Sequence, residues 1–523
     1  MEKKANPSCP HCRSNKTRKK GKTDHHKYQR YSCRECDRDF QETTSEARGE
    51  PIKFNNKLPA SSTYVITAAQ NATPANEPFL NSLLTYCKHN NAQLLIIPIR
   101  YKNPTSLWSK NQEHDEWWDE KLVPYLYAKR KKLNNNIEIM GDIKIQPTAV
   151  NPLAGMEGLS RGLSAVFAHP KLQLKTIPTP QNKLPCIMTT TGIVTQKNFT
   201  DTKAGKKGEF HMVTGAAVVE LESREEFHLR QINALPDGSF IDWDKEYFPD
   251  GKIKKAGPPQ LLFMGDTHYE HHEKSVDTAI FGKKGILRQL DPQNKTILFW
   301  NDLLDGYSMN PHHNGNPFIS YAKNQSNMHL VRDEVFRTIK YLKSRTGKRK
   351  SVIVGSNHDD FLKRWLMTCD WRMDPANADF YLKTALAVLN DTHKDGGGTY
   401  VPDPFAYWVE KLNTEGHDIQ CLRAGDSYVV GNVENGYHGH KGPNGARGTV
   451  KNLSQMGCKI NSAHQHSPAI EGPHFKAGTG SRLKLEYSED SPSSWLHSSI
   501  LQYANGKRTL VNIINGRTRP KKK

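Results

Sequence analysis

The sequence predicts a mixed α/β protein built from more than one domain. The chain has 523 residues, and at roughly 150 residues per domain we expect two to four domains. Hydrophobic residues make up 36% of the chain and aromatic residues 9%, which is enough apolar material for several cores. Short apolar runs alternate with helical patterns over most of the length, and this alternation is typical of α/β folds.

Composition divides the chain into three parts, a linker and a tail, and no internal repeat is evident. Residues 1–45 form a small basic segment, 46–61 a polar linker, 62–255 a mixed α/β domain, 256–515 a larger α/β domain, and 516–523 a basic tail. We expect the domain of residues 62–255 to be separate from the one that follows. The residues of this middle domain do not indicate its role.

The middle part begins with a βαβ pattern. A strand is expected over Tyr64–Ala68, a helix over Asn76–Asn90, and a second strand over Gln93–Ile97, because apolar periodicity changes from strand-like to helical and back. Further β-rich runs cover residues 137–145, 187–194 and 212–221. This part also holds scattered acidic and imidazole groups at irregular spacing, to which we assign no catalytic role: Asp142, His169 and His211.

The charge balance points to a polyanionic partner. Lys and Arg number 74 against 54 Asp and Glu, a net charge of +20, which favours binding to nucleic acid over other classes of partner. The densest apolar run, Leu94–Ile99, is far shorter than the roughly 18 to 20 residues that cross a bilayer. The polar N-terminus carries no secretion signal. We therefore expect a cytoplasmic protein without a membrane partner.

Two Cys-x-x-Cys pairs in the first part predict a structural zinc site. Cys9 and Cys12 form one pair, Cys33 and Cys36 the other, with 20 residues between the pairs. Four thiolates at this spacing can hold one Zn²⁺ in a closed tetrahedron. A segment this small buries little core, so the metal is expected to supply its folding free energy. The remaining five of nine cysteines lie far apart, which is unlike a disulfide framework.

The same segment is strongly basic. From Met1 to Arg34 there are 11 Lys and Arg against two acids, and tyrosines interleaved with them suit stacking on exposed bases. The pattern resembles the zinc ribbons of some transposase and replication proteins, although ribbons also mediate protein contacts. The residues expected to contact nucleic acid are Arg13, Lys16, Arg18, Lys19, Lys20 and Lys22.

Five polar motifs follow one another in the third part, and the first three each follow an apolar β run. Polar residues at the carboxyl ends of adjacent strands gather at one edge of a sheet, where α/β sites form. The motifs are Gly265-Asp266-Thr267-His268, Asn301-Asp302-Leu303-Leu304-Asp305, Ser356-Asn357-His358-Asp359, His438-Gly439-His440 and Ala463-His464-Gln465-His466. Carboxylate, imidazole and amide groups suit Mn²⁺, Fe or Zn²⁺, and one carboxylate can bridge two ions that activate a water.

The ordered set resembles the calcineurin-like metallophosphoesterase superfamily. That resemblance implies a four-layer α/β-β/α sandwich over residues 256–515 and two divalent ions, with Mn²⁺ favoured over Fe, Zn²⁺ or Mg²⁺. It also implies a protonating role for His358 at the leaving group, and supporting roles for Asp305 and Asp359. The implied ligands are Asp266, His268 and His466 for one ion, Asn357, His438 and His464 for the other, and Asp302 between them.

The motifs depart from the family pattern in small ways. Asn301 and Ala463 stand where Gly is usual, and Ser356 interrupts a Gly-Asn step. None of these changes a ligand. Gly306-Tyr307 stands where phosphoprotein phosphatases carry a phosphate-clamping Arg, which argues against a protein phosphatase.

These features together predict a two-metal phosphodiesterase acting on DNA, a nuclease helped by its zinc ribbon. The arrangement looks like that of bacteriophage-encoded metallophosphoesterases, so we expect action in a host bacterial cytoplasm, with a homo-oligomer as one assembly open to it. Two alternatives stay open. One is a phosphatase or cyclic-nucleotide phosphodiesterase for a small substrate. The other is a DNA-binding protein whose phosphoesterase fold is inactive.

Overall fold

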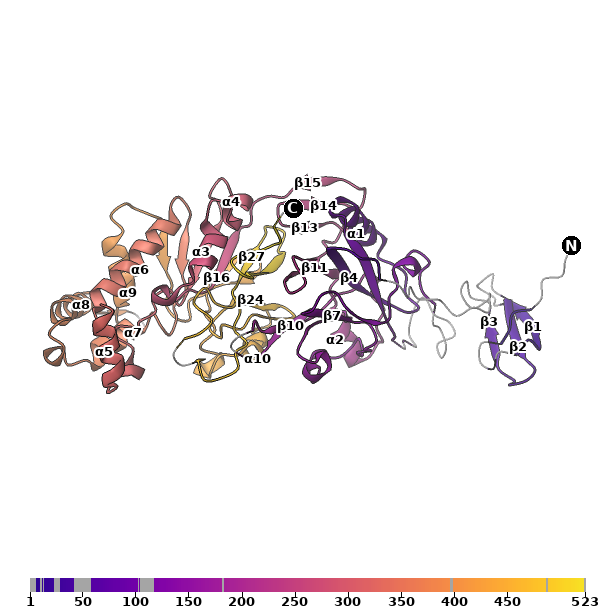
Figure 1. Cartoon of the computed structure of the whole chain (residues 1–523), viewed down its shortest axis with the longest axis horizontal. Helices are drawn as coiled ribbons and strands as arrows, with labels where there is room; N and C mark the ends of the chain where they lie inside the picture. The colour runs from indigo at the N-terminus through magenta and orange to yellow at the C-terminus, as the bar shows by residue number, and fades with distance from the viewer. Residues whose placement is uncertain are drawn as a thin grey trace.

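The computed structural model gives a mixed α/β architecture with several sheets, which confirms the fold class at that level (Figure 1). The residues described are 6–9, 12, 14–22, 29–41, 58–101, 103, 117–180, 183–395, 398–485 and 488–521. Among them, no helix combines the length and the apolarity that a bilayer crossing needs.

The N-terminal segment folds as a three-stranded antiparallel sheet of β1 (Thr17–Lys22), β2 (Gln29–Cys33) and β3 (Asp39–Gln41). Its core is a small cluster in which the rings of Tyr31 and Phe40 stack with centroids 5.5 Å apart. Such a core is too small to stabilise a fold alone.

The third part is centred on a six-stranded sheet. Its first four strands run parallel and its last two antiparallel. In order they are β21 (Ile419–Cys421), β18 (Ser351–Ile353), β17 (Ile297–Asn301), β16 (Leu261–Asp266), β27 (Ser498–Gln502) and β28 (Arg508–Asn512). Helices cover one face through a large apolar cluster: α3 (Lys274–Phe281), α4 (Ile286–Leu290), α6 (Val331–Thr346), α7 (Phe361–Thr368), α8 (Ala378–Asp391) and α9 (Pro404–Leu412).

A ten-stranded sheet packs against the other face and joins the middle part to the third. Five strands come from the third part: β22 (Val429–Val430), β23 (Val433–Glu434), β24 (Lys459–Ser462), β26 (His474–Lys476) and β25 (Ala469–Glu471). The sheet continues through the middle part with β9 (Gln173–Ile177), β10 (Cys186–Thr190), β8 (Ser164–Phe167), β7 (Ile137–Met140) and β6 (Arg130–Lys132). Strands β25 and β9 pair directly, and one apolar cluster spans both parts. The sequence predicted a separate middle domain, and the shared sheet contradicts that separation.

The middle part completes its own two layers with a four-stranded sheet. This sheet runs β12 (Phe227–Asn233), β11 (Gly215–Leu221), β4 (Thr63–Gln70) and β5 (Gln93–Ile99), with α1 (Glu77–Asn90) connecting β4 to β5 as the sequence predicted. Smaller elements are β13 (Phe240–Asp242), β14 (Lys245–Tyr247), β15 (Ile253–Lys255), β19 (His393–Asp395), β20 (Gly398–Tyr400), α2 (Lys203–His211) and α5 (Pro317–Gln325).

The layers of the third part differ from the expected four. Helices, the six-stranded sheet and the ten-stranded sheet form three layers. The far face of the ten-stranded sheet carries the short α10 (Val450–Leu453), where the Val450 carbonyl oxygen lies 3.3 Å from His474 Nδ1. The second helical layer implied by the family resemblance is therefore reduced here to about one turn.

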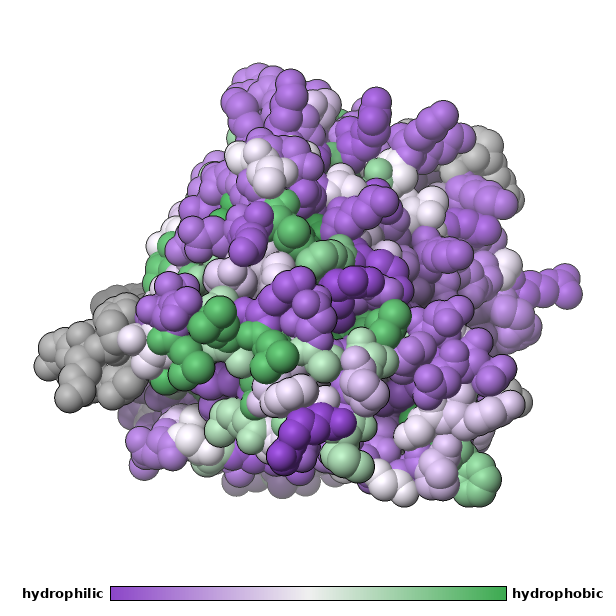
Figure 2. Space-filling view, turned by 90° about the vertical axis from the view of Figure 1, so that its left-hand side faces the viewer, coloured by the Kyte–Doolittle hydropathy of each residue, from purple (hydrophilic) through white to green (hydrophobic). Residues whose placement is uncertain are grey.

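The helical end of the molecule exposes apolar side chains. Figure 2 shows them gathered in green on the face formed by α5, α7 and α8, which lie at the left of Figure 1. Exposed large apolar residues on these helices are Phe318, Tyr321, Met367, Leu382, Leu386 and Leu389. Contiguous apolar surface of this kind is typical of contact faces, and the predicted homo-oligomer stays a prediction.

Candidate metal centre

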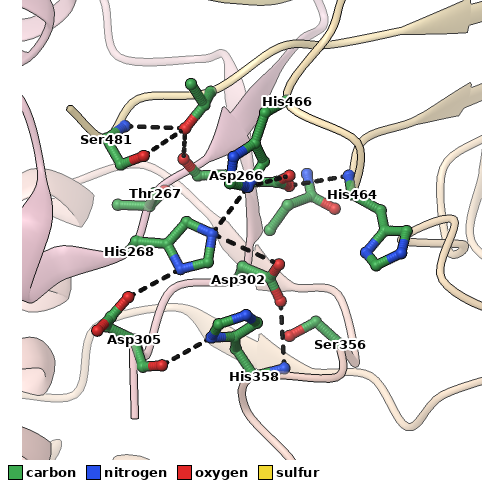
Figure 3. Close-up of polar contacts among 12 residues, drawn as sticks. Asp266, Thr267, His268, Asp302, Asp305, Ser356, His358, His464, His466 and Ser481 are labelled. Atoms are coloured by element: carbon green, nitrogen blue, oxygen red, sulfur yellow. Dashed lines mark hydrogen bonds and ion pairs between the residues drawn. The ribbon is translucent and has the colours of Figure 1, made fainter. Parts of the chain in front are cut away.

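The predicted ligands converge at the carboxyl ends of the strands that precede them. Asp266 ends β16, Asp302 follows β17, and His438 and His464 follow β23 and β24. Because β16 and β17 run parallel, their ends meet at one edge of the six-stranded sheet. The ten-stranded sheet brings its histidines to the same edge, so residues 200 positions apart face one another (Figure 3).

The first group combines two carboxylates with two imidazoles. Ligand atoms of Asp266, His268, Asp302 and His466 all lie within 4.8 Å of one another, and all four residues are buried. His268 Nε2 lies 3.0 Å from His466 Nε2, and His466 Nε2 lies 3.2 Å from Asp266 Oδ2. Four donor groups around one small space have the chemistry of a divalent cation site.

The second group shares one carboxylate with the first. Ligand atoms of Asp302, His438 and His464 also lie within 4.8 Å of one another. His438 Nε2 is 3.1 Å from Asp302 Oδ2, and the backbone N–H of His464 donates to Asp266 Oδ1 at 3.0 Å. Asp302 is thus the residue common to both groups, as a bridging ligand must be.

Backbone strain is concentrated in these ligands. His268, Asp302, His464 and His466 adopt φ angles of 42°, 39°, 76° and 56°. Residues other than glycine adopt this left-handed region at a cost of about 1 to 3 kcal/mol each. Four residues with this backbone strain point their side chains into one space, which indicates that the fold holds them there for function.

Within the described residues three buried ligand atoms make no hydrogen bond: Asn357 Oδ1, and also Asp266 Oδ2 and His438 Nε2, whose contacts to His466 at 3.2 Å and to Asp302 at 3.1 Å are ion pairs. Leaving a buried polar atom such as Asn357 Oδ1 unpaired costs about 1 to 3 kcal/mol. All three belong to side chains that the sequence predicted as ligands. The donor set therefore fits divalent cations, and Asn357 stays the predicted amide ligand of the second group.

Hydrogen bonds fix the proton on His268. Its Nδ1 lies 3.0 Å from Asp305 Oδ1, which can only accept, so Nδ1 carries the proton and Nε2 presents its lone pair to the other ligands. A carboxylate behind a ligating histidine is the usual orienting device at metal sites. Asp305 therefore contacts a predicted ligand, and its supporting role stays a prediction.

The two carboxylates draw positive charge into the centre. Burial alone would raise the pKa of Asp302, but His438, His358 and His268 hold it well below its ordinary range. Burial lowers the pKa of His438, yet Asp302 and Asp266 raise it to about 9. In the metal-free chain His438 therefore holds a proton at neutral pH, and cation binding must release it.

His358 lies beside the first group. Its ring centroid is 4.4 Å from that of His268, its Nδ1 donates to the Asp305 carbonyl oxygen at 2.7 Å, and its backbone N–H donates to Asp302 Oδ1 at 3.3 Å. Burial lowers its pKa, but the carboxylates of Asp302 and Asp305 outweigh burial and raise it. The side chain is suited to donate a proton.

Asp359 has contacts other than those expected. It accepts from the Leu304 backbone N–H at 3.1 Å and from Ser356 Oγ at 2.9 Å, so it joins the loops after β17 and β18. Two residues were missed from the sequence. Asn301 Oδ1 lies 3.3 Å from His438 Nδ1 and orients that ring, and Trp495 packs on His466 with centroids 4.2 Å apart. Adjacency to Asp302 was a signal for the first; nothing in the sequence marks the second.

A cavity of about 410 Å³ opens beside the second group. Its wall includes Gly355, Tyr437, His438, His440 and Lys441, so polar and aromatic groups border the ligands directly. An opening of this size leaves room for part of a ligand next to these donor groups.

The four N-terminal thiols form a separate cluster. Cys9 Sγ and Cys36 Sγ are 3.6 Å apart, Cys12 Sγ and Cys33 Sγ are 3.5 Å apart, and all four lie within 4.8 Å of one another. Sulfurs around a tetrahedral Zn²⁺ with bonds of about 2.3 Å are separated by about 3.8 Å, so the cluster fits zinc.

The basic residues of the ribbon are exposed where they are described. Arg18 and Lys19 lie on β1. Lys16 pairs with Glu35 and Lys20 with Asp39, each at 2.6 Å. Arg13 and the side chain of Lys22 lie outside the described residues.

Comparison with known proteins gives one close parallel. Over 469 residues the chain is 30% identical to Protein A1 of Escherichia phage T5, and the alignment covers 87% of this chain and 82% of that protein. No family model matches the sequence, and no solved structure matches the fold. Identity at this level over nearly the full length of both chains establishes common descent, and the protein accordingly belongs to the family of the phage T5 protein A1.

Proposed function

We propose that this chain is a two-metal phosphodiesterase of the metallophosphoesterase type that cleaves DNA. The observation that carries the proposal is the shared position of Asp302 between two buried donor groups. A pair of divalent cations, when bound, polarises a phosphate ester and activates water for attack on phosphorus. Asp266, His268 and His466 would hold one ion and Asn357, His438 and His464 the other, with Asp302 between them.

The protein's own groups then handle orientation and protons. Asp305 fixes the tautomer of His268 through its 3.0 Å contact, and Asn301 orients His438. His358, whose pKa the carboxylates of Asp302 and Asp305 raise, is placed to protonate the oxygen that leaves when the ester bond breaks. Its hydrogen bond to the Asp305 carbonyl oxygen keeps the ring in position for that transfer.

The choice of DNA as substrate rests on charge. The net charge of +20 favours a polyanion. The zinc ribbon presents Arg18 and Lys19 on an exposed strand, where phosphates can approach them. The relative comes from a bacteriophage, which agrees with action inside an infected bacterial cell.

The direct test is cleavage of linear and circular DNA in Mn²⁺ by the wild type and by Asp302→Asn. The variant is expected to lose cleavage, whereas Asp379→Asn, an exposed carboxylate paired with Lys383, keeps it. His358→Ala should lower the rate by about 10² to 10⁴-fold with the Mn²⁺ content unchanged. Intact DNA together with rapid turnover of a chromogenic phosphate ester would instead favour a small-substrate phosphatase.

DNA binding by the ribbon is tested separately. The double variant Arg18→Gln, Lys19→Gln should reduce the slope of log affinity against log salt by about 2, because each phosphate contact contributes about 0.9. The double variant Lys340→Gln, Lys383→Gln, at exposed positions of α6 and α8, serves as the charge-matched control. An unchanged slope in the double variant would remove the ribbon from the DNA interface.

A further inference from the structure

We infer that the middle part is a second copy of the phosphoesterase fold that has lost its metal site, so that the chain is a covalent pseudo-dimer. The part of this inference that assigns metal binding and catalysis to the third part alone rests on the proposed function. The evidence that the two parts share one topology does not.

The sheet orders of the two parts are the same. In the middle part the four-stranded sheet runs β5-β4-β11-β12, and in the third part β17-β16-β27-β28 stand in the same order with the same parallel and antiparallel pairings. Each pair of parallel strands is connected by helix, α1 in one copy and α3 with α4 in the other.

The ten-stranded sheet repeats the match in its two halves. One half runs β6-β7-β8-β10-β9 and the other β22-β23-β24-β26-β25. In both, the first pair is antiparallel, the next two are parallel and the last is antiparallel. In each half the strand that comes fourth in the chain, β25 or β9, stands last, at the end where the two halves meet. Nine strands therefore correspond in chain order, sheet order and direction.

Single residues correspond as well. Ala68 forms a parallel bridge to Ile193 as Asp266 does to Thr479. Three residues before the bridge residues Ile193 and Thr479 lie Thr190 and Lys476, which are therefore equivalent. Thr190 pairs with Phe167 and Lys476 pairs with Ser462, so Phe167 and Ser462 are equivalent too. The next two residues are then Ala168-His169 in one copy and Ala463-His464 in the other.

The contact between the copies has two-fold symmetry. By the same counting, Leu174 of β9 and Ile470 of β25 occupy equivalent positions, and they face each other in the antiparallel pair. Antiparallel pairing about a two-fold axis requires equivalent residues to meet in this way. The other layer agrees, since equivalent strands β12 and β28 lie side by side and Asn512 Nδ2 donates to the Leu229 carbonyl oxygen at 3.5 Å.

The middle copy replaces two of the metal ligands with neutral groups. Ala68 stands at the position of Asp266 and Gln70 at that of His268. Gln70 Nε2 donates to the Asn198 carbonyl oxygen at 2.7 Å, while the Asn198 side chain accepts from Asn103 at 2.6 Å and donates to Thr73 Oγ1 at 2.8 Å. This amide network is buried and closed. It needs no cation, in contrast to the other copy, where Asn357 Oδ1 has no hydrogen-bond partner.

The histidine that both copies keep, His169 in the middle copy, already has hydrogen-bond partners. His169 Nδ1 accepts from the Lys171 backbone N–H at 3.0 Å, and its Nε2 lies 3.1 Å from the Gln146 carbonyl oxygen. Asp142, two-fold equivalent to His438, is partly exposed and pairs with Arg130 at 3.3 Å. Among the residues that the structure describes between β5 and β6, the middle copy shows no counterpart of β18, β21 or the helices between them, the region that supplies Asn357 and His358. We name it the silent copy.

The test compares equivalent positions in the two copies of the full chain. Mn²⁺ content is measured by mass spectrometry after gel filtration, together with the thermal midpoint, for Gln70→Ala against His268→Ala. Gln70→Ala should keep the two Mn²⁺ of the wild type and lower the midpoint by about 2 to 6 °C, because it opens a buried network. His268→Ala should lose at least one ion. If Gln70→Ala does not fold, His169→Asn against His464→Asn makes the same comparison.

Three results would overturn the inference in different ways. Loss of Mn²⁺ from Gln70→Ala or His169→Asn, with the wild type loaded, would show that the silent copy holds an ion. A wild type that binds no Mn²⁺ would contradict the proposed function and, with it, the assignment of metal binding and catalysis to the third part. An experimental structure in which the nine equivalent strands do not superpose by a rotation close to 180° would refute the duplication itself.

Discussion

Replacing Asp302 with Asn tests the shared ligand most directly. Asp302 belongs to both donor groups, so one substitution should weaken both ions. An ion present at 100 times its dissociation constant stabilises the folded chain by about 2.7 kcal/mol, and two ions by about 5 kcal/mol. For a chain of this size that corresponds to a rise in the thermal midpoint on the order of 5 °C.

The assay is the change in thermal midpoint when MnCl₂ is added to zinc-loaded, manganese-free protein. Wild type should show the full rise, His464→Asn about half of it, and Asp302→Asn less than about 1 °C. The exposed control Asp379→Asn should behave as wild type. A full rise in Asp302→Asn would refute the reasoning, because the bridging position would then be dispensable.

Three further predictions concern stability. Cys33→Ser should unfold the ribbon and release one zinc per chain, measured by a colorimetric chelator, while leaving Mn²⁺ content unchanged; zinc retained at full occupancy would contradict the four-thiol site. Burial and nearby Asp305 raise the pKa of Glu334 from 4.5 to about 7, so its contribution to stability is fully present below pH 4.5 and lost as pH rises through 7. The fall in thermal midpoint between those pH values should be smaller in Glu334→Gln, and equal slopes would argue against a raised pKa. Phe299→Ala removes a fully buried ring stacked 6.0 Å from Phe263 and should cost about 3 to 5 kcal/mol in denaturant unfolding; a cost below about 1 kcal/mol would indicate a core that collapses around the gap.

The sequence was most informative where polar residues end apolar strands. Asp266 and Asp302 could be placed because parallel strand ends meet at one edge whatever the rest of the fold does. His438 and His464 were implied only by the family resemblance. They follow strands of the ten-stranded sheet, and the packing of that sheet against the six-stranded one brings them to the other ligands. The contacts of Asp359 were not predictable, because they depend on how two loops pack.

The repeat and the shared sheet escaped sequence reasoning for a physical reason. A paired strand needs only alternating buried and exposed side chains, and many residue types meet that need. Two copies can therefore keep the same topology after losing nearly all sequence identity. Ala168-His169 and Ala463-His464 are a match of two residues, too short to notice without the strand pairing. In the inferred duplication the predicted boundary near residue 255 separates the two copies, but the β9 and β25 contact crosses it.

The pairing of β9 with β25 also governs how the protein can be divided. Strand β25 would otherwise be a bare edge next to the apolar Ile470 and Phe475, and an open edge of that kind recruits strands from other molecules. The silent copy therefore acts as a permanent cover for the working one. Expression of residues 256–515 alone should give aggregates, and a shortened chain that keeps only the candidate metal centre will need a substitute for that cover.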